Sequence, residues 1–385
     1  MSYQFHTTPS LHIGEGYAAL IGELAGKSLG KQVLVVTDKG LRDLGLLDPA
    51  LQSLRSAGIR VDIFDKVEAD PPLAVLQECV AAALANDITG IVGFGGGSSM
   101  DVAKVTALLA GSGEDLDAAW GVNNARGPRL PLVLVPTTAG TGSEVTPVSI
   151  ITIDGDEKRG VSSPVLLPDM AILDAGLTIG LPKHITAATG IDAMVHAIEA
   201  YTSKSANNNP VSRALAVEAL RLLGANIQTA CFDGGNVAAR QAMLTGSMLA
   251  GMAFANSPVA AVHALAYPVG GMFHIPHGLS NALVLKEVMR FNAPVCYRQY
   301  AELSAHVFPD MDGSRSAQAV CAEFIERLGA LSEKIGLEPR LRDAGIGEEA
   351  LPLMAQAAMK QTRLLVNNPR DVSQADALAI YRAAW

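Results

Sequence analysis

Four polar residues in the second half of the chain could together hold a divalent metal ion. Asp192 and His196 stand four positions apart in IDAMVHAIEAY, so on a helix both side chains project from one face. His263 and His277 follow in AVHALAYPVGGMFHIPHG. A carboxylate with neutral imidazoles suits Fe(II) or Zn(II), and the absence of a cysteine ligand argues against a closed structural zinc site. We therefore predict a metal centre with a position open to substrate, although a single isolated histidine is more often an ordinary hydrogen-bonded residue.

A glycine-rich segment in the first half, IVGFGGGSSMD, is typical of a loop that binds phosphate groups. Gly95, Gly96 and Gly97 lack Cβ atoms, so their backbone N–H groups can approach a pyrophosphate, and Ser98 opens a helical pattern whose positive end would face it. In the usual dinucleotide fingerprint an acidic residue follows the loop, whereas here Asp38 precedes it. Asp38 ends the first strong strand candidate, where it could accept a hydrogen bond from the adenosine ribose. A plain tight turn is the alternative explanation of the glycines.

The elements that must position these residues fall into two groups. Short apolar runs at 31–37, 60–64, 90–94 and 131–136 alternate with helical patterns such as 73–85, which predicts a mostly parallel sheet covered by helices. From residue 186 the pattern is almost wholly helical. We expect an α/β, Rossmann-like dinucleotide-binding domain over 1–181 and an all-α metal-binding domain over 182–385, divided near Leu181 and Pro182, with the reaction in the cleft between them.

Composition agrees with a two-domain enzyme and argues against several other classes. The 385 residues exceed what one core normally supports. Hydrophobic residues make up 49% of the chain, but no apolar run reaches the length of a membrane span. The net charge of -9 leaves no basic surface for nucleic acid. The N-terminus lacks a secretory pattern and the four cysteines form no CxxC pair, so we expect a cytoplasmic protein with reduced thiols.

The motifs resemble those of one enzyme family along nearly the whole chain. IVGFGGGSSMD, LVLVPTTAGTGSEVT, LPDMAILD, TAATGIDAMVHAIEAYTS and HALAYPVGGMFHIPHGLSNA follow, in order, the motifs of the iron-containing (group III) alcohol dehydrogenases. The chain looks closest to the lactaldehyde reductase, 1,3-propanediol dehydrogenase and butanol dehydrogenase branch. The resemblance implies the dehydroquinate synthase-like fold, NAD as cofactor, Fe(II) with Zn(II) possible in the metal site, and a homodimer or larger homo-oligomer.

The resemblance also assigns roles to single residues. Asp192, His196, His263 and His277 match the family's four metal ligands, and Asp38 matches the position that favours NAD over NADP. The remaining matches concern the cofactor: the pyrophosphate loop at Gly95, Gly96, Gly97, Ser98 and Asp101, the threonine-rich loop at Thr137, Thr138, Thr141 and Ser143, and the lysine at the nicotinamide half, Lys158.

One position departs from the family pattern. Many members carry a second histidine four residues after the third ligand, usually assigned to proton transfer, where this chain has Tyr267. His274, three residues before the last ligand, is the other candidate for the relay. An imidazole is the better shuttle near neutral pH, so we expect His274 to set the pH dependence and Tyr267 to shape the pocket. A tyrosine that is simply packed is an equal alternative.

The predicted function is reversible hydride transfer between NAD(H) and a small primary alcohol or diol, with the metal stabilising the alkoxide or polarising the aldehyde. Met252 and Phe254, shortly before His263, could narrow the substrate pocket, although such residues are more often plain core. Three alternatives stay open: a polyol or hydroxyacid dehydrogenase, a transhydrogenase, and an inactive homologue that binds nucleotide or metal. A lyase of the dehydroquinate synthase type is disfavoured, because no basic cluster for a phosphorylated acid lies near the ligands in the sequence.

Overall fold

The computed structural model describes residues 2–153 and 157–385. The chain forms two compact units, His6–Ile179 and Gly180–Trp385, and the second also contains the N-terminal residues through Phe5. Gln4 belongs there because its backbone N–H donates to Asn207 Oδ1 at 2.9 Å and its carbonyl accepts from Asn207 Nδ2 at 2.9 Å.

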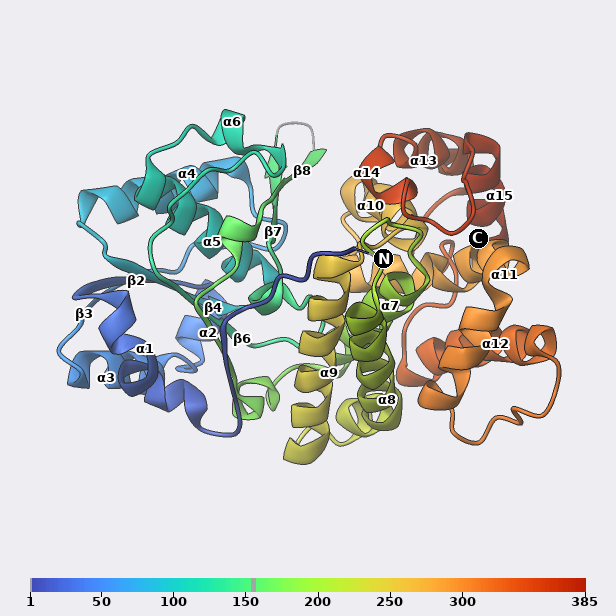
Figure 1. Ribbon diagram of the computed structural model, residues 1–385, viewed down its shortest axis with the longest axis horizontal. Coiled ribbons are helices and arrows are strands. Elements are labelled where there is room, and N and C mark those ends of the chain that lie inside the picture. Colours follow the sequence, from blue (N-terminus) through green and yellow to red (C-terminus); the bar gives the residue numbers. More distant parts are fainter. Residues whose placement is uncertain (1, 154–156) are drawn as a thin grey trace. The chain divides into compact units, whose positions relative to one another are not determined.

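The first unit is built on a sheet of six parallel strands (Figure 1). In spatial order the strands are β3 (Arg60–Phe64), β2 (Gln32–Val36), β4 (Gly90–Gly95), β6 (Leu132–Pro136), β9 (Met170–Leu173) and β1 (Ser10–Ile13). β2, β4 and β6 are buried along their whole length, as expected for parallel strands with helices on both faces. This architecture confirms the α/β sheet predicted from the alternating pattern.

Alternate residues of the central strands enter two separate cores. Leu34, Leu132 and Leu134 pack with α4 (Leu73–Ala85) and α5 (Gly97–Ser112). Val33 and Val35 face the other way, toward α1 (Ile21–Leu29) and α3 (Asp48–Ser56). The period of two along each strand therefore places one pair of helices on each face of the sheet.

The strand order creates a topological switch point between β2 and β4. After β2 the chain adds β3 on one side and then returns to place β4 on the other side of β2. In open α/β sheets ligands bind at such a switch point, beyond the carboxyl ends of the strands. Asp38 follows β2, and Gly95, Gly96 and Gly97 run from the end of β4 into α5, so these predicted cofactor residues flank the switch point.

A second, smaller sheet was not predicted from the sequence. β7 (Val148–Ile153) and β8 (Glu157–Ser162) pair antiparallel, and the two-residue β5 (Gly121–Val122) runs parallel to β8. The other short elements of this unit are α2 (Lys39–Asp43), α6 (Leu116–Ala119) and the 3-10 helices η1 (Tyr17–Leu20), η2 (Ser143–Val145), η4 (Pro164–Leu166) and η5 (Ala175–Thr178).

The second unit contains helices and no strand among its described residues, which confirms the predicted all-helical character. Its helices are α7 (Lys183–Thr202), α8 (Pro210–Phe232), α9 (Val237–Asn256), α10 (Ala261–Phe273), α11 (His277–Val307), α12 (Ala317–Ile335), η6 (Glu348–Ala350), α13 (Leu351–Ala358), α14 (Thr362–Leu365) and α15 (Gln374–Ala384). Asparagine caps start α8 and α9, where Asn209 and Asn236 accept from backbone N–H groups of the first turn.

Helix α7 lies at the centre of this unit. It packs against α8, α9 and α11, and Figure 1 shows α7, α8 and α9 side by side. Nearly every residue of α7 from Thr186 to Ala200 is buried, as expected for a helix surrounded by others. Polar side chains on α7 are therefore held in the interior. Within the described residues, no single helix has the length and apolarity needed to cross a membrane, and α9 with α10 meets both criteria only as a pair bent by 108°.

Candidate active site

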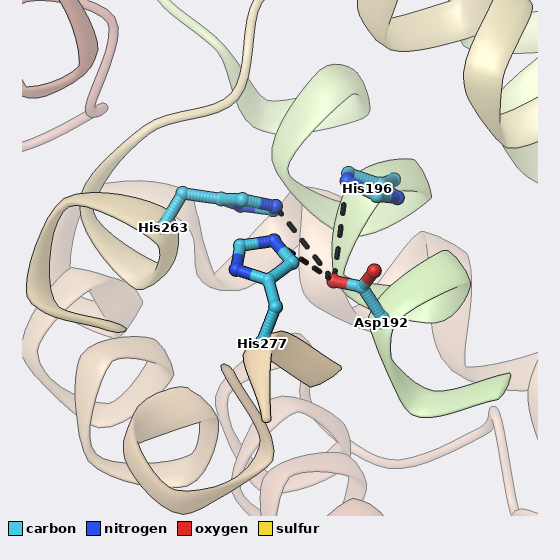
Figure 2. A group of neighbouring side chains, drawn as sticks. All are labelled: Asp192, His196, His263 and His277. Carbon is cyan, nitrogen blue, oxygen red and sulfur yellow. Dashed lines mark ion pairs between the residues drawn. The ribbon is translucent and has the colours of Figure 1, made fainter. Parts of the chain in front are cut away.

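The four predicted metal ligands come together in the helical unit (Figure 2). Asp192 and His196 lie one turn apart on α7, His263 is in the first turn of α10, and His277 is the first residue of α11. Asp192 Oδ1 lies 4.0, 3.8 and 3.7 Å from the Nε2 atoms of His196, His263 and His277, respectively. One ligand atom from each residue lies within 4.8 Å of the others.

This group of atoms fits a divalent cation. Metal bonds of about 2.0–2.2 Å to nitrogen and oxygen require ligand atoms only a few ångström apart, as found here. Asp192 is 2% exposed, and a buried carboxylate needs a compensating charge. The Nε2 atom of His263 is buried without a hydrogen-bond partner among the described residues. A buried imidazole nitrogen that faces a buried carboxylate is a donor set that a divalent cation satisfies.

Two residues that support the ligands were missed in the sequence. Asn281, one turn after His277 on α11, donates from Nδ2 to Asp192 Oδ1 at 2.6 Å. Glu199, three residues after His196 on α7, lies with Oε2 2.7 Å from His263 Nδ1. Both have helical spacing from a predicted ligand, so the i+3 and i+4 positions around the ligands would have pointed to them.

One aromatic ring packs against a ligand. Phe254, a predicted pocket residue, stacks on His196 with ring centroids 4.3 Å apart. Met252 has only a backbone role among the described hydrogen bonds, where its carbonyl accepts from Asn256 Nδ2 at 3.0 Å. The substrate-pocket role of both residues stays a prediction.

The two relay candidates lie in different surroundings. Tyr267 is in α10, one turn after His263, and its ring centroid lies 6.1 Å from that of His277. Its hydroxyl accepts from Arg363 Nη2 at 3.3 Å. His274 is exposed at the end of α10 in a left-handed conformation with φ of 54°, and no described hydrogen bond or ring contact joins it to the ligands. The structure therefore brings Tyr267, rather than His274, into contact with the metal ligands.

In the first unit, the glycine loop meets the threonine-rich loop closely. A Cβ atom on Gly97 would lie 2.9 Å from Thr141 Cγ2, and one on Gly96 would lie 3.6 Å from Thr138 Cγ2. Gly95 has φ of +154°, and a Cβ there would lie 2.6 Å from Ser99 Oγ. Larger residues at Gly95 and Gly97 would thus displace the loop.

The glycine loop also leads directly into a helix. Gly97 and Ser98 are the first residues of α5, so their N–H groups lack partners within the helix and are available to an anion. Thr137 joins the two loops, because its N–H donates to the Gly95 carbonyl at 3.0 Å.

The predicted cofactor residue Asp101 makes its contacts within the protein. Its carboxylate accepts from Ser143 Oγ at 2.7 Å and from the Ile150 N–H at 2.8 Å. Lys104, which the sequence did not single out, is fully buried and donates to Ser143 Oγ at 2.7 Å and to the Val148 carbonyl at 2.8 Å. Burial raises the pKa of Asp101 and lowers the pKa of Lys104 to about 8. This network fixes the threonine-rich loop against α5.

The two remaining cofactor candidates lie on other elements. Asp38 Oδ1 accepts from the Leu41 N–H at 2.9 Å and so caps α2. Lys158 lies on β8, where its ammonium pairs with Asp70. Any contact of either residue with a cofactor stays a prediction.

The fold and this site are those of a metal-dependent enzyme with a sheet of the dinucleotide-binding type. Comparison with known proteins identifies its family and the class of reaction. Residues 8–175 match the family Iron-containing alcohol dehydrogenase, and residues 186–385 match Fe-containing alcohol dehydrogenase family, C-terminal. The chain belongs to the iron-containing alcohol dehydrogenase family and is an oxidoreductase. The predicted family and its dehydroquinate synthase-like fold are thereby confirmed.

Several relatives resemble the chain over its whole length. It is 41% identical to long-chain-alcohol dehydrogenase 1 of Geobacillus thermodenitrificans, over 98% of this chain and 95% of the relative. It is 38% identical to 1,3-propanediol dehydrogenase of Klebsiella pneumoniae, over 100% of both chains.

Two solved structures have the same fold. The crystal structure of 1,3-propanediol oxidoreductase superposes with a TM-score of 0.96 at 37% identity, over 100% of both chains. The structure of sulfoacetaldehyde reductase from Bifidobacterium kashiwanohense, in complex with NAD+, gives a TM-score of 0.87 at 27% identity, over 100% of this chain and 99% of that one.

Proposed function

We propose that this enzyme interconverts a small primary alcohol or diol and its aldehyde by hydride transfer to or from NAD(H), at a divalent metal held by Asp192, His196, His263 and His277. The observation that carries the proposal is the convergence of these four side chains, with the buried Nε2 of His263 left without a hydrogen-bond partner among the described residues. When bound, the ion would polarise the carbonyl oxygen during reduction and stabilise the alkoxide during oxidation.

The protein's own residues would provide binding and orientation. Asp192 supplies the negative charge, and Asn281 holds its Oδ1 in place through the hydrogen bond at 2.6 Å. Phe254 stacks on His196 and limits the rotation of that ring. The hydroxyl of Tyr267, near His277, could exchange a proton as both donor and acceptor.

NAD as the cofactor is supported by the predicted cofactor residues at the switch point of the sheet. The N–H groups that open α5 would receive the pyrophosphate, and Asp38 would accept a hydrogen bond from the adenosine ribose. A structural relative, sulfoacetaldehyde reductase, was solved with NAD+. The division of tasks, nucleotide for residues 1–181 and metal for residues 182–385, is part of the proposal.

Fe(II) is the proposed ion because of the family, and Zn(II) is the alternative for the same ligands. We also propose a cytoplasmic homo-oligomer. The four cysteines, all free and buried, agree with a reducing compartment. Light scattering gives the mass of the assembly, and elemental analysis of anaerobically purified protein identifies the ion.

The test of the function is NADH oxidation by the Fe(II)-loaded protein with aldehydes of increasing chain length, and NAD reduction with the matching alcohols and diols. The series must include long chains, because the relatives include both a 1,3-propanediol and a long-chain-alcohol dehydrogenase. We expect turnover with free NADH and highest kcat/KM for short substrates. Activity only with a second carbonyl compound present, and none with free NAD, would instead indicate a transhydrogenase. A preference for polyols or hydroxyacids would indicate a polyol or hydroxyacid dehydrogenase. Metal binding without any turnover would indicate an inactive homologue.

A further inference from the structure

We propose that Glu199 is a positioning residue for the metal: its carboxylate holds the His263 ring in the tautomer that presents the unprotonated Nε2 to the ion. This inference rests on the proposed function and deepens it, because it assigns a task to a residue outside the four ligands.

The carboxylate of Glu199 has three neighbours that approach it as donors. Oε1 accepts from the Val262 N–H at 2.7 Å, and Oε2 accepts from the Ala260 N–H at 3.0 Å. Oε2 also lies 2.7 Å from His263 Nδ1. Glu199 is only 4% exposed, so these protein groups replace water as its partners.

These contacts fix the proton on the imidazole. Both oxygens of Glu199 already accept backbone N–H groups, so the carboxylate also acts as the acceptor toward His263, whose Nδ1 carries the proton. A neutral imidazole carries one N–H, which leaves the lone pair on Nε2. That atom is the one that lies 3.8 Å from Asp192 Oδ1 and has no described hydrogen-bond partner.

The same carboxylate also fixes where α10 begins. Ala260 is the N-cap of α10 and has no side chain that can cap it. Glu199 accepts from N–H groups at this helix start, which have no partner within the helix, and its negative charge is favourable there. Asp192, His196 and Glu199 lie at i, i+4 and i+7 on one face of α7, so one helix face carries two ligands and the group that orients a third.

The test measures Co(II) binding to metal-free protein by competition with a chelator and by the visible absorption of the bound ion. Glu199→Gln keeps the shape of the side chain but replaces one acceptor oxygen with a donor, so one of the three donors loses its partner. We expect Co(II) affinity to fall by about 10–100-fold, with a changed absorption spectrum.

Ser257→Ala is the matched control for loosened packing. Ser257 is fully buried before α10, and its Oγ donates to the Ala200 carbonyl at 2.7 Å, so it links the same segment to α7 without contacting His263. We expect this variant to lower the melting temperature of the metal-free protein but to keep the wild-type Co(II) affinity. An equal loss of affinity in both variants would show that Glu199 acts only through packing, and would overturn the inference.

A double-mutant cycle tests whether Glu199 acts through His263. In a His263→Ala background, Glu199→Gln should cause no further loss of Co(II) affinity, whereas independent losses would contradict the proposed path. A Glu199→Gln protein with wild-type affinity and spectrum would overturn this inference alone. A wild-type protein that binds no Co(II), or a His277→Ala variant that binds it normally, would overturn the proposed metal site as well.

One measurement needs no Glu199 variant. Nitrogen NMR of metal-free wild-type protein labelled at its eight histidines reports the tautomer of each ring. The signal that disappears in His263→Ala should show a protonated Nδ1 and an unprotonated Nε2. The opposite tautomer would contradict the inference even if Glu199→Gln failed to fold.

Discussion

At the scale of single residues, four carboxylates differ in task because their oxygens meet different donors. Asp101 has both oxygens hydrogen-bonded within the protein, and Asp38 uses one oxygen to cap α2. Asp192 faces the Nε2 atoms of three histidines, and Glu199 faces two backbone N–H groups and Nδ1 of His263. Residue type alone would not separate these tasks, whereas the partners of each oxygen do.

The Asp38 carboxylate should decide between NAD and NADP. A carboxylate beside the ribose accepts from a 2′-hydroxyl and repels a 2′-phosphate. Asp38→Gly should raise the ratio of kcat/KM for NADP to that for NAD by about tenfold, equivalent to about 1.4 kcal/mol. Asp38→Asn is the matched control for helix capping, because it keeps an acceptor for the Leu41 N–H and removes only the charge. Both variants should shift the ratio, and an unchanged ratio in both would show that Asp38 does not contact the ribose.

The proton relay can be assigned from the pH dependence of kcat. Imidazole is the side chain that exchanges protons most readily near neutral pH, whereas a phenol acts mainly as a hydrogen-bond donor and acceptor. If His274 is the relay, as the sequence suggested, His274→Ala should change the pH profile and Tyr267→Phe should leave it unchanged. Tyr267 is the alternative relay, because its ring lies close to that of His277. A profile that is unaltered in the histidine variant and changed in the tyrosine variant would assign the relay to Tyr267.

At the scale of elements, buried charges hold the threonine-rich loop against α5. Lys104 donates to Ser143 and Val148, and Ser143 donates to Asp101, so three segments share one network. Glu144, next in the chain, is buried with Oε1 unpaired among the described residues. Burial raises the pKa of the Glu144 carboxyl from 4.5 to about 7. The packing that positions this loop therefore buries the Glu144 carboxyl group and disfavours its ionisation.

This element should make stability depend on pH. Between pH 4.5 and about 7 the unfolded chain has lost the Glu144 proton while the folded protein keeps it, so this group lowers wild-type stability as the pH rises. Glu144→Gln cannot ionise, so the variant should gain stability relative to the wild type as the pH rises. The difference in free energy of unfolding between variant and wild type should be about 1–3 kcal/mol larger at pH 8 than at pH 5. Urea unfolding at both pH values measures the difference. Glu23→Gln, at an exposed position on α1, is the control and should show no such change. A Glu144→Gln difference that is equal at the two pH values would refute the prediction.

At the scale of the whole molecule, the sequence predicted the main strands and helices better than the contacts between distant parts of the chain. Short apolar runs identified β2, β3, β4 and β6, because central strands of a parallel sheet are covered by helices on both faces. The antiparallel β7 and β8 were missed, since β8 reads EKRGVS and contains no apolar run. The second compact unit also contains the N-terminal residues through Phe5, and the hydrogen bonds between Gln4 and Asn207 that join them to it are not visible in any local sequence pattern.

The candidate site shows the same limit. Asp192 and His196 have a local helical spacing, so chemistry and periodicity were enough to find them. Glu199 and Asn281 act on partners 64 and 89 positions away, and such contacts are fixed only by the packing of α7 against α10 and α11. Lys104 was missed because a lysine in a helical pattern is normally solvated, whereas here the loop beneath it supplies oxygen partners.

The central claim, that catalysis requires one metal ion held by these four residues, is tested most directly by measuring NADH turnover against bound metal. Metal-free protein should be inactive, and activity should rise in proportion to added Fe(II) until one ion is bound per chain. His277→Ala should keep its helical circular dichroism, retain the ion poorly and show no turnover. Full turnover after exhaustive chelation, or near-normal turnover by a His277→Ala protein with one ion per chain, would contradict the claim.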